Sequence, residues 1–102
     1  MNIRLWFDRV SSQGDITDKI TNKVRGVEKY LRHVSEDLKS GFVHLSRGDR
    51  WGYKVKMGIT IPGREVVAEA KEETLLSAVD RAYGRLAREV RKGLERLKEK
   101  RR

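Results

Sequence analysis

Residues 53–71, YKVKMGITIPGREVVAEAK, decide the fold of this chain. From Tyr53 to Ile61 apolar side chains alternate with polar or small ones, as in a strand with one buried face. Pro62 and Gly63 form a pair typical of tight turns, and the alternation resumes from Glu65 to Lys71. The stretch therefore predicts a β-hairpin with one apolar and one polar face.

Upstream of the hairpin, the pattern predicts a strand, a helix and a second strand. Residues 2–10 alternate like a half-buried strand, and residues 42–47 form a short strand. Between them apolar residues recur at steps of four, four, three and four, as on one side of a helix: Ile16, Ile20, Val24, Val27 and Leu31. The helix is expected to end near Val34, and its N-cap is Ser12, Asp15 or Thr17. Residues 35–41 and 48–52 are expected to be loops.

Downstream of the hairpin, Thr74 is the expected N-cap of a long helix that runs to the C-terminus. Its predicted buried stripe is Leu75, Val79, Ala82, Leu86, Val90 and Leu97, with Tyr83 and Leu94 at the edge. Residues 75–102 would span about 42 Å at ~1.5 Å per residue. Because a core of this size cannot cover that length, we expect the helix to project or fray beyond about residue 95.

The element order β-α-β-β-β-α predicts an α+β domain of two layers, a four-stranded sheet with two helices packed on one face. Residues 1–102 are expected to form this single domain. The other sheet face carries charges of both signs and reads as solvated: Arg4, Asp8, Lys54, Lys56, Thr60, Glu65, Glu69 and Lys71.

The composition favours a nucleic-acid partner. The chain has a formal net charge of +9 and no cysteine. The absence of cysteine excludes a disulfide framework, a thiolate zinc site and a cysteine nucleophile. No apolar run approaches the ~20 residues that span a bilayer, and we expect the N-terminal segment not to be a signal peptide, because charges interrupt its apolar run. We therefore expect a cytoplasmic protein that binds a polyanion, nucleic acid before anionic membrane.

The basic excess lies on the two predicted helices. Residues 17–34 hold five basic and two acidic side chains, residues 75–102 hold ten and four, and the remainder holds nine of each. Five cations follow one another along the second helix at steps of four, three, four and four: Arg81, Arg85, Arg88, Lys92 and Arg96. Arginine grips phosphate with two hydrogen bonds, so this stripe favours a nucleic-acid backbone over a solvated face. Binding to a membrane surface is a weaker hypothesis, because the apolar stripe that would insert into lipid is needed for the core.

Residue patterns for catalysis or metal binding are not recognisable. His33 and His44 have no carboxylate at metal-ligand spacing, no glycine-rich loop fits a phosphate-binding pattern, and no serine-histidine-acid arrangement is suggested. We expect no catalytic residue, cofactor, metal or small-molecule substrate. Trp6 and Trp51 are read as packing residues before base-stacking ones.

Three segments carry a family resemblance. ITNKVRGVEKYL at 20–31 looks like a first-helix segment of the type V-x-x-K-L-x-K-L-E-K-Y-F, and RLAREVRK at 85–92 looks like K-L-x-R-Q-L-x-K. MGITIPGREVVAEAKEETLLSAVD at 57–80 is similar to a hairpin that leads into an A-I-D motif. In this order the segments resemble the ribosome hibernation promoting factors, also called ribosome-associated inhibitors or sigma-54 modulation proteins, in their short form.

The resemblance implies the same fold and a non-enzymatic role. It implies binding in the messenger and transfer RNA channel of the small ribosomal subunit, near the decoding centre, where the protein blocks translation under stress. Away from the ribosome we expect a monomer. Lys23, Lys29, Arg85, Arg88 and Lys92 match basic family positions, whereas Gly26 and Leu94 replace lysines and Glu89 replaces a glutamine. The expected contacts with ribosomal RNA are Lys23, Arg25, Lys29, Arg81, Arg85, Arg88, Arg91, Lys92 and Arg96.

Three other readings stay open. A double-stranded RNA-binding module also places two helices on a sheet, but it lacks the first strand predicted here and should have basic loops. The second is a regulatory module that binds an acidic protein partner, which competition by RNA at physiological salt would distinguish. An enzyme with an unrecognised site is the third.

Overall fold

The computed structural model describes residues 1–11 and 14–100, with side chains as far as residue 93. The elements follow the predicted order: β1 (Asn2–Asp8), α1 (Gly14–Arg25), a 3-10 helix η1 (Gly26–Tyr30), a 3-10 turn η2 (Glu36–Leu38), β2 (Ser40–Arg47), β3 (Tyr53–Ile61), β4 (Arg64–Glu72) and α2 (Leu75–Lys100). The prediction of a β-α-β-β-β-α fold is confirmed.

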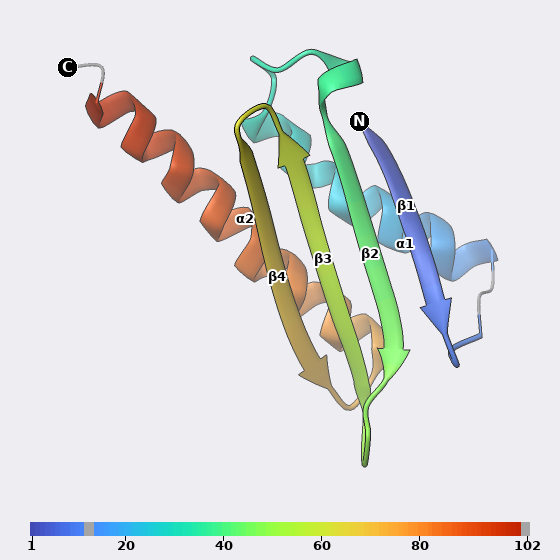
Figure 1. The fold of residues 1–102 in the computed structure, drawn as a ribbon. Coiled ribbons are helices and arrows are strands. Elements are labelled where there is room, and N and C mark those ends of the chain that lie inside the picture. The colour runs from blue at the N-terminus through green and yellow to red at the C-terminus, as the bar shows by residue number, and fades with distance from the viewer. Residues whose placement is uncertain (12–13, 101–102) are drawn as a thin grey trace.

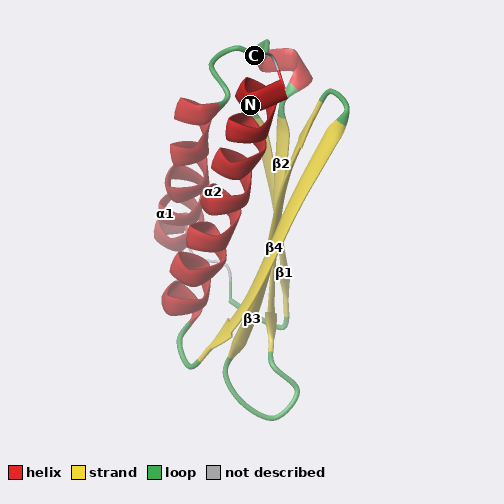
Figure 2. Ribbon diagram, turned by 90° about the vertical axis from the view of Figure 1, so that its left-hand side faces the viewer, coloured by secondary structure: helices red, strands yellow, loops and turns green. Residues whose placement is uncertain are grey.

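The four strands form one mixed sheet in the order β1-β2-β3-β4. Strands β1 and β2 are parallel, and the other two pairs are antiparallel. The parallel pair needs a crossover connection, which α1 provides. Both helices cover the same face of the sheet, and the other face is open (Figures 1 and 2). This arrangement leaves β4 as an edge strand directly beneath α2.

The core fills the space between the helices and the covered sheet face. Leu45 and Met57 from the sheet and Ile20 and Leu86 from the helices are fully buried. The predicted stripe of α2 is buried at Val79, Ala82, Leu86 and Val90, while Leu75 and Tyr83 are partly buried. Leu94 and Leu97 lie beyond the described side chains. For the same reason, the expected fraying beyond about residue 95 stays a prediction.

The first helix differs from its prediction at both ends. It begins at Gly14, so Asp15 and Thr17 lie inside it and neither is the N-cap, while Ser12 falls outside the described residues. It ends as an α-helix at Arg25 and continues as 3-10 helix to Tyr30, so the prediction of an end near Val34 was wrong. The change occurs at Gly26, which lies against Tyr83 of α2. A Cβ at Gly26 would lie 2.6 Å from the Tyr83 hydroxyl, and only glycine leaves room for that contact.

The segment before β2 is more ordered than the predicted loop. It contains η2, and β2 starts at Ser40, two residues earlier than expected. Lys39 is buried between these elements, with its Nζ 3.1 Å from the Glu36 carboxylate. The same Nζ donates a 3.4 Å hydrogen bond to the carbonyl of Leu31, the residue that follows η1. The predicted cap of α2 is confirmed: the Ser77 amide donates to the Thr74 hydroxyl at 3.1 Å.

Two glycines should respond to alanine in opposite ways. Gly84 lies in the middle of α2, and a Cβ there would meet no heavy atom within 4 Å beyond the backbone of its own helix, so Gly84→Ala should stabilise the fold by about 1 kcal/mol. Gly52, in the β2–β3 loop, has a φ of +68°, and a Cβ there would collide with the Glu72 carbonyl oxygen. Gly52→Ala should therefore cost more than the ~1–2 kcal/mol of left-handed strain alone. Urea unfolding of both variants checks this, and changes of the same sign would contradict it.

Candidate nucleic-acid interface

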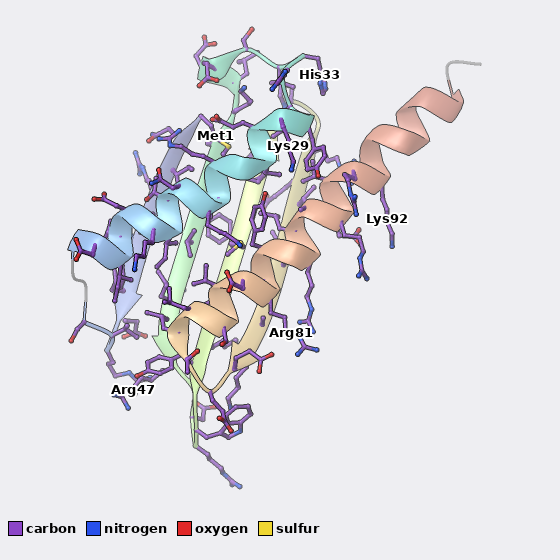
Figure 3. The ribbon with its side chains drawn as sticks, turned by 180° about the vertical axis from the view of Figure 1, so that it is seen from behind. Met1, Lys29, His33, Arg47, Arg81 and Lys92 are labelled. Atoms are coloured by element: carbon purple, nitrogen blue, oxygen red, sulfur yellow. The ribbon has the colours of Figure 1, made fainter. Side chains whose placement is uncertain are left out.

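The basic stripe of α2 runs along the flank that faces away from α1. Figure 3 shows Arg81 and Lys92 on this side. The cause is helix geometry, because positions 81, 85, 88 and 92 share a face next to the buried one. The flank lies against the edge of the sheet: Arg81 Nη1 is 2.7 Å from the Glu72 carboxylate on β4. We call Arg81, Arg85, Arg88 and Lys92 the outer flank.

Part of this charge has a structural task at the edge of β4. Arg85 donates a 2.6 Å hydrogen bond to the backbone carbonyl of Glu69. In return Arg64 of β4 donates to the carbonyl of Glu89 on α2, at 3.1 Å. The Arg64 guanidinium occupies the space that a side chain at Gly93 would need. These arginines cover an edge strand whose free backbone groups could otherwise pair with another chain.

Three other cations among the described side chains of α2 are free or only weakly paired. Arg88 and Arg91 are exposed and make no ion pair with any other described residue. Lys92 Nζ lies 3.7 Å from the Glu89 carboxylate, but both groups are exposed, and such pairs contribute little. Arg91 precedes Lys92 by one residue, about 100° around the helix, so it points away from the sheet. The side chain of Arg96 is not among those described.

The cations of the first helix do not join the outer flank. Lys23 lies in the seam between the helices, with its Nζ 3.2 Å from the Asp80 carboxylate and 5.5 Å from the centre of the Tyr83 ring. Both charged groups of this pair are exposed, so Asp80 is a surface partner of Lys23. Arg25 turns the other way and donates a 3.0 Å hydrogen bond to the carbonyl of Met1.

A second basic group surrounds the end of η1. Arg25, Lys29 and Arg32 line a hollow there together with the carboxylates of Glu28 and Glu36. Lys29 is exposed (Figure 3). Its Nζ is 5.1 Å from the centre of the neighbouring Tyr30 ring. The structure thus places seven of the nine predicted contacts in the outer flank, the seam or this η1 group. Arg91 lies outside these groups, and the Arg96 side chain is not described.

The acids of the η1 group are occupied by the N-terminal amine. The Met1 amine pairs with Glu36 and lies 3.2 Å from the Glu28 carboxylate. Its hydrogen bond to Glu36 raises the pKa of the Met1 amine above its usual value. The same bond, followed by the one from Lys39, lowers the pKa of Glu36. The pairing leaves Lys29 and Arg32 as exposed cations at this end.

Sequence reasoning missed three residues with clear roles. Arg64 was left between the predicted turn and the predicted strand, but it begins β4 and closes the edge of that strand against α2. Lys39 was read as a loop residue, but it is buried. Phe42 lies on the open face of the sheet, packed against Trp6 with ring centroids 6.5 Å apart. Only Phe42 left a signal, because Val43 and Leu45 point inward and residues 42 and 44 must point outward.

Other site types find little support in the part of the chain that is described. No helix there is long and apolar enough to cross a membrane. The described residues contain no group of three or more histidine, cysteine, aspartate or glutamate side chains that could hold a metal ion.

Comparisons with known proteins converge on one family. The family described as sigma 54 modulation protein / S30EA ribosomal protein matches residues 4–98. The crystal structure of the N-terminal domain of Protein Y from Thermus thermophilus superposes with a TM-score of 0.75 at 26% identity, covering 90% of this chain and 98% of that one. A ribosomal subunit interface protein from Coxiella burnetii superposes with a TM-score of 0.72 at 14% identity, covering 93% and 99%, and so shares the fold. No curated protein matches by sequence.

Proposed function

The chain belongs to the sigma 54 modulation protein / S30EA ribosomal protein family, and from that premise we propose that it binds the small ribosomal subunit and holds the ribosome idle. Members of this family are non-enzymatic regulators that bind ribosomes. The proposed site is the messenger and transfer RNA channel near the decoding centre. A protein seated there would exclude both RNAs, and it would act under stress, as a monomer in the cytoplasm.

The observation that supports this proposal best is the set of unpaired cations on α2. Arg88 and Arg91 have no ion-pair partner among the described residues, and Lys92 has only a weak one. An array of like charges repels itself, and an external anion relieves that repulsion. Ribosomal RNA supplies closely spaced phosphates, which arginine and lysine bind without reading the sequence.

The arrangement of the basic groups suits a partner that surrounds the protein. The outer flank and the η1 group face different directions, as the contacts of Arg81 with β4 and of Arg25 with Met1 show. A single RNA duplex on one side of the protein could contact either the outer flank or the η1 group, but not both. A channel with RNA on more than one side would meet both, so recognition would depend on shape and phosphate positions.

The structure also bears on the alternative of a double-stranded RNA-binding module. Such a module has no strand before its first helix. In this chain β1 pairs along its whole length with β2, from Asn2 opposite Ser40 to Asp8 opposite Ser46. The β2–β3 loop is not basic, because its charged residues are Asp49 and Arg50. The cations beside it lie over aromatic rings, with Arg47 of β2 5.5 Å from the Tyr53 ring centre and Lys71 of β4 4.7 Å from that of Trp51. Both features favour the ribosomal assignment.

Ribosome binding should depend steeply on salt. If at least four phosphates are neutralised, the logarithm of the binding constant should fall with the logarithm of the potassium concentration with a slope of about −3 or steeper. Pelleting with ribosomes across a potassium series, at fixed magnesium so that the subunits stay intact, measures the slope. A slope near zero would indicate an apolar contact with a ribosomal protein and would contradict phosphate binding.

A further inference from the structure

The open face of the sheet carries an aromatic pair that the helical site does not use. The side chain of Trp6 on β1 is 51% exposed, and Phe42 on β2 is partly exposed. Their rings are tilted by 59° with centroids 6.5 Å apart. Figure 2 shows that both helices lie on the opposite face, so no described element covers this pair. Soluble proteins rarely leave contiguous apolar groups exposed, and where they do, the exposed patch marks an interaction site.

Gly58 sets the position of Phe42. Phe42 lies opposite Gly58 in the β2–β3 register, and Gly58 lies opposite Val67 of β4. A Cβ at Gly58 would collide with the edge of the Phe42 ring. The ring therefore lies down across β3 in the space that glycine leaves, instead of standing away from the sheet. Together Trp6, Phe42 and the exposed Val67 form an apolar band across the sheet.

Unpaired cations flank this band. Arg4 and Lys56 are exposed and form no ion pair with other described residues. The acids nearest to them are already used: Asp8 lies 3.8 Å from Arg9, and Glu69 lies 2.6 Å from Lys54. The second pairing lowers the pKa of Glu69 and raises that of Lys54, in each case through their hydrogen bond. Glu65 is the remaining acid of this face, and it lies on β4, three strands away from Arg4.

The chemistry of the face selects among possible occupants. An apolar protein surface would bury Arg4 and Lys56 without partners, which is costly. An RNA duplex keeps its bases stacked inside and offers no ring to Trp6. A single strand offers both flat bases for the rings and phosphates for the cations, which is how four-stranded sheets with surface aromatics bind RNA. A hollow lined by Asn2, Ser40 and Thr60 beside the two rings adds amide and hydroxyl groups within reach of a base edge.

We propose that the open sheet face binds a short single-stranded RNA segment, with one base stacked on Trp6, the next on Phe42, and the backbone phosphates bound by Arg4 and Lys56. This surface is separate from the helical cations, so it adds a second RNA contact to the domain. Its binding does not require the ribosome, and its failure would leave the proposed function standing.

The experiment measures the affinity of the whole chain for a fluorescein-labelled uridine octamer by anisotropy, near physiological salt. The chain offers a matched control, because Trp51 in the β2–β3 loop is 52% exposed, almost the same as Trp6. Trp6→Ala should weaken binding about 5- to 150-fold, the range for loss of one stacked base, and Trp51→Ala should change it less than about twofold. Lys56→Glu, which removes no packing, should weaken it as well. Circular dichroism verifies folding of each variant.

Three results would overturn the proposal. One is equal binding by the Trp6 and Trp51 variants, which would make the contact non-specific. Another is competition by a blunt RNA duplex as strong as that by the unlabelled octamer. The third is no saturable binding of the octamer below about 100 μM, the weak end of non-specific affinities, which would leave the face to a protein partner. Pelleting of the same variants with ribosomes reports on the proposed function separately.

Discussion

Reversing two charges on the outer flank, Arg88→Glu together with Lys92→Glu, is expected to weaken ribosome binding by at least about 100-fold. If the proposed function holds, each substitution removes a charge-assisted hydrogen bond to phosphate, worth about 1.5–3 kcal/mol, and adds a repelling carboxylate. The fold should survive, since Arg88 has no ion-pair partner among the described residues and the Lys92 pair with Glu89 is exposed. Substitutions at exposed positions of this kind usually change the free energy of unfolding by no more than about 0.5 kcal/mol.

The choice of these two positions follows from the edge contacts of β4. Arg85 would be a poor target because it donates to the Glu69 carbonyl, and Arg81 because it pairs with Glu72. Loss of binding in those variants could reflect a disturbed edge. Substitutions at Arg88 and Lys92 test the loss of phosphate contacts without disturbing the edge of β4.

A matched control tests whether net charge alone explains the loss. Arg47→Glu together with Arg50→Glu changes the charge by the same amount, at exposed positions at the end of β2 and in the β2–β3 loop. We expect this variant to retain ribosome binding within about threefold, because the Debye length is about 8 Å at physiological salt. Pelleting of both double variants, with circular dichroism for the fold, gives the comparison. Full binding by a folded Arg88/Lys92 variant would refute the assignment of the outer flank.

Shortening Leu86 to alanine should destabilise the domain by about 2–5 kcal/mol. Leu86 is 0% exposed and projects from α2 into the core between the helices and the sheet. Its loss leaves a cavity that a small core cannot refill, and the total stability of such a domain is only about 5–15 kcal/mol. Leu76→Ala on the same helix is the control, because Leu76 is 45% exposed and its change should stay within about 0.5 kcal/mol. Urea unfolding that finds the two variants equally stable would contradict this account of the core.

The parts of the fold that the sequence predicts are those set by local patterns. The alternation from Tyr53 to Ile61 fixes which face of the hairpin is buried, and Thr74 marks the start of α2 through its own hydroxyl. The change from α-helix to 3-10 helix at Gly26 has no such pattern. At this glycine the fold also brings in Tyr83, more than fifty residues further along the chain, whose hydroxyl lies where a Cβ at Gly26 would be. Burial of Lys39 likewise depends on a carbonyl of the segment that follows η1.

The candidate site shows the same limit. The spacing of Arg81, Arg85, Arg88 and Lys92 places them on one flank of α2, as the geometry of a helix requires. Spacing could not reveal that β4 lies beside that flank and offers Glu72 and the Glu69 carbonyl as partners. Nor could it show that Arg25 and Lys23 turn in different directions, toward Met1 and Asp80. Whether a cation is free depends on what the fold brings next to it.

The most direct test of the central claim is co-sedimentation of the protein with separated small and large ribosomal subunits, near physiological salt. The account predicts saturable one-to-one binding to the small subunit, lost when messenger and transfer RNA are added together. Equal binding to both subunits, or binding that these RNAs do not displace, would contradict a position in the RNA channel.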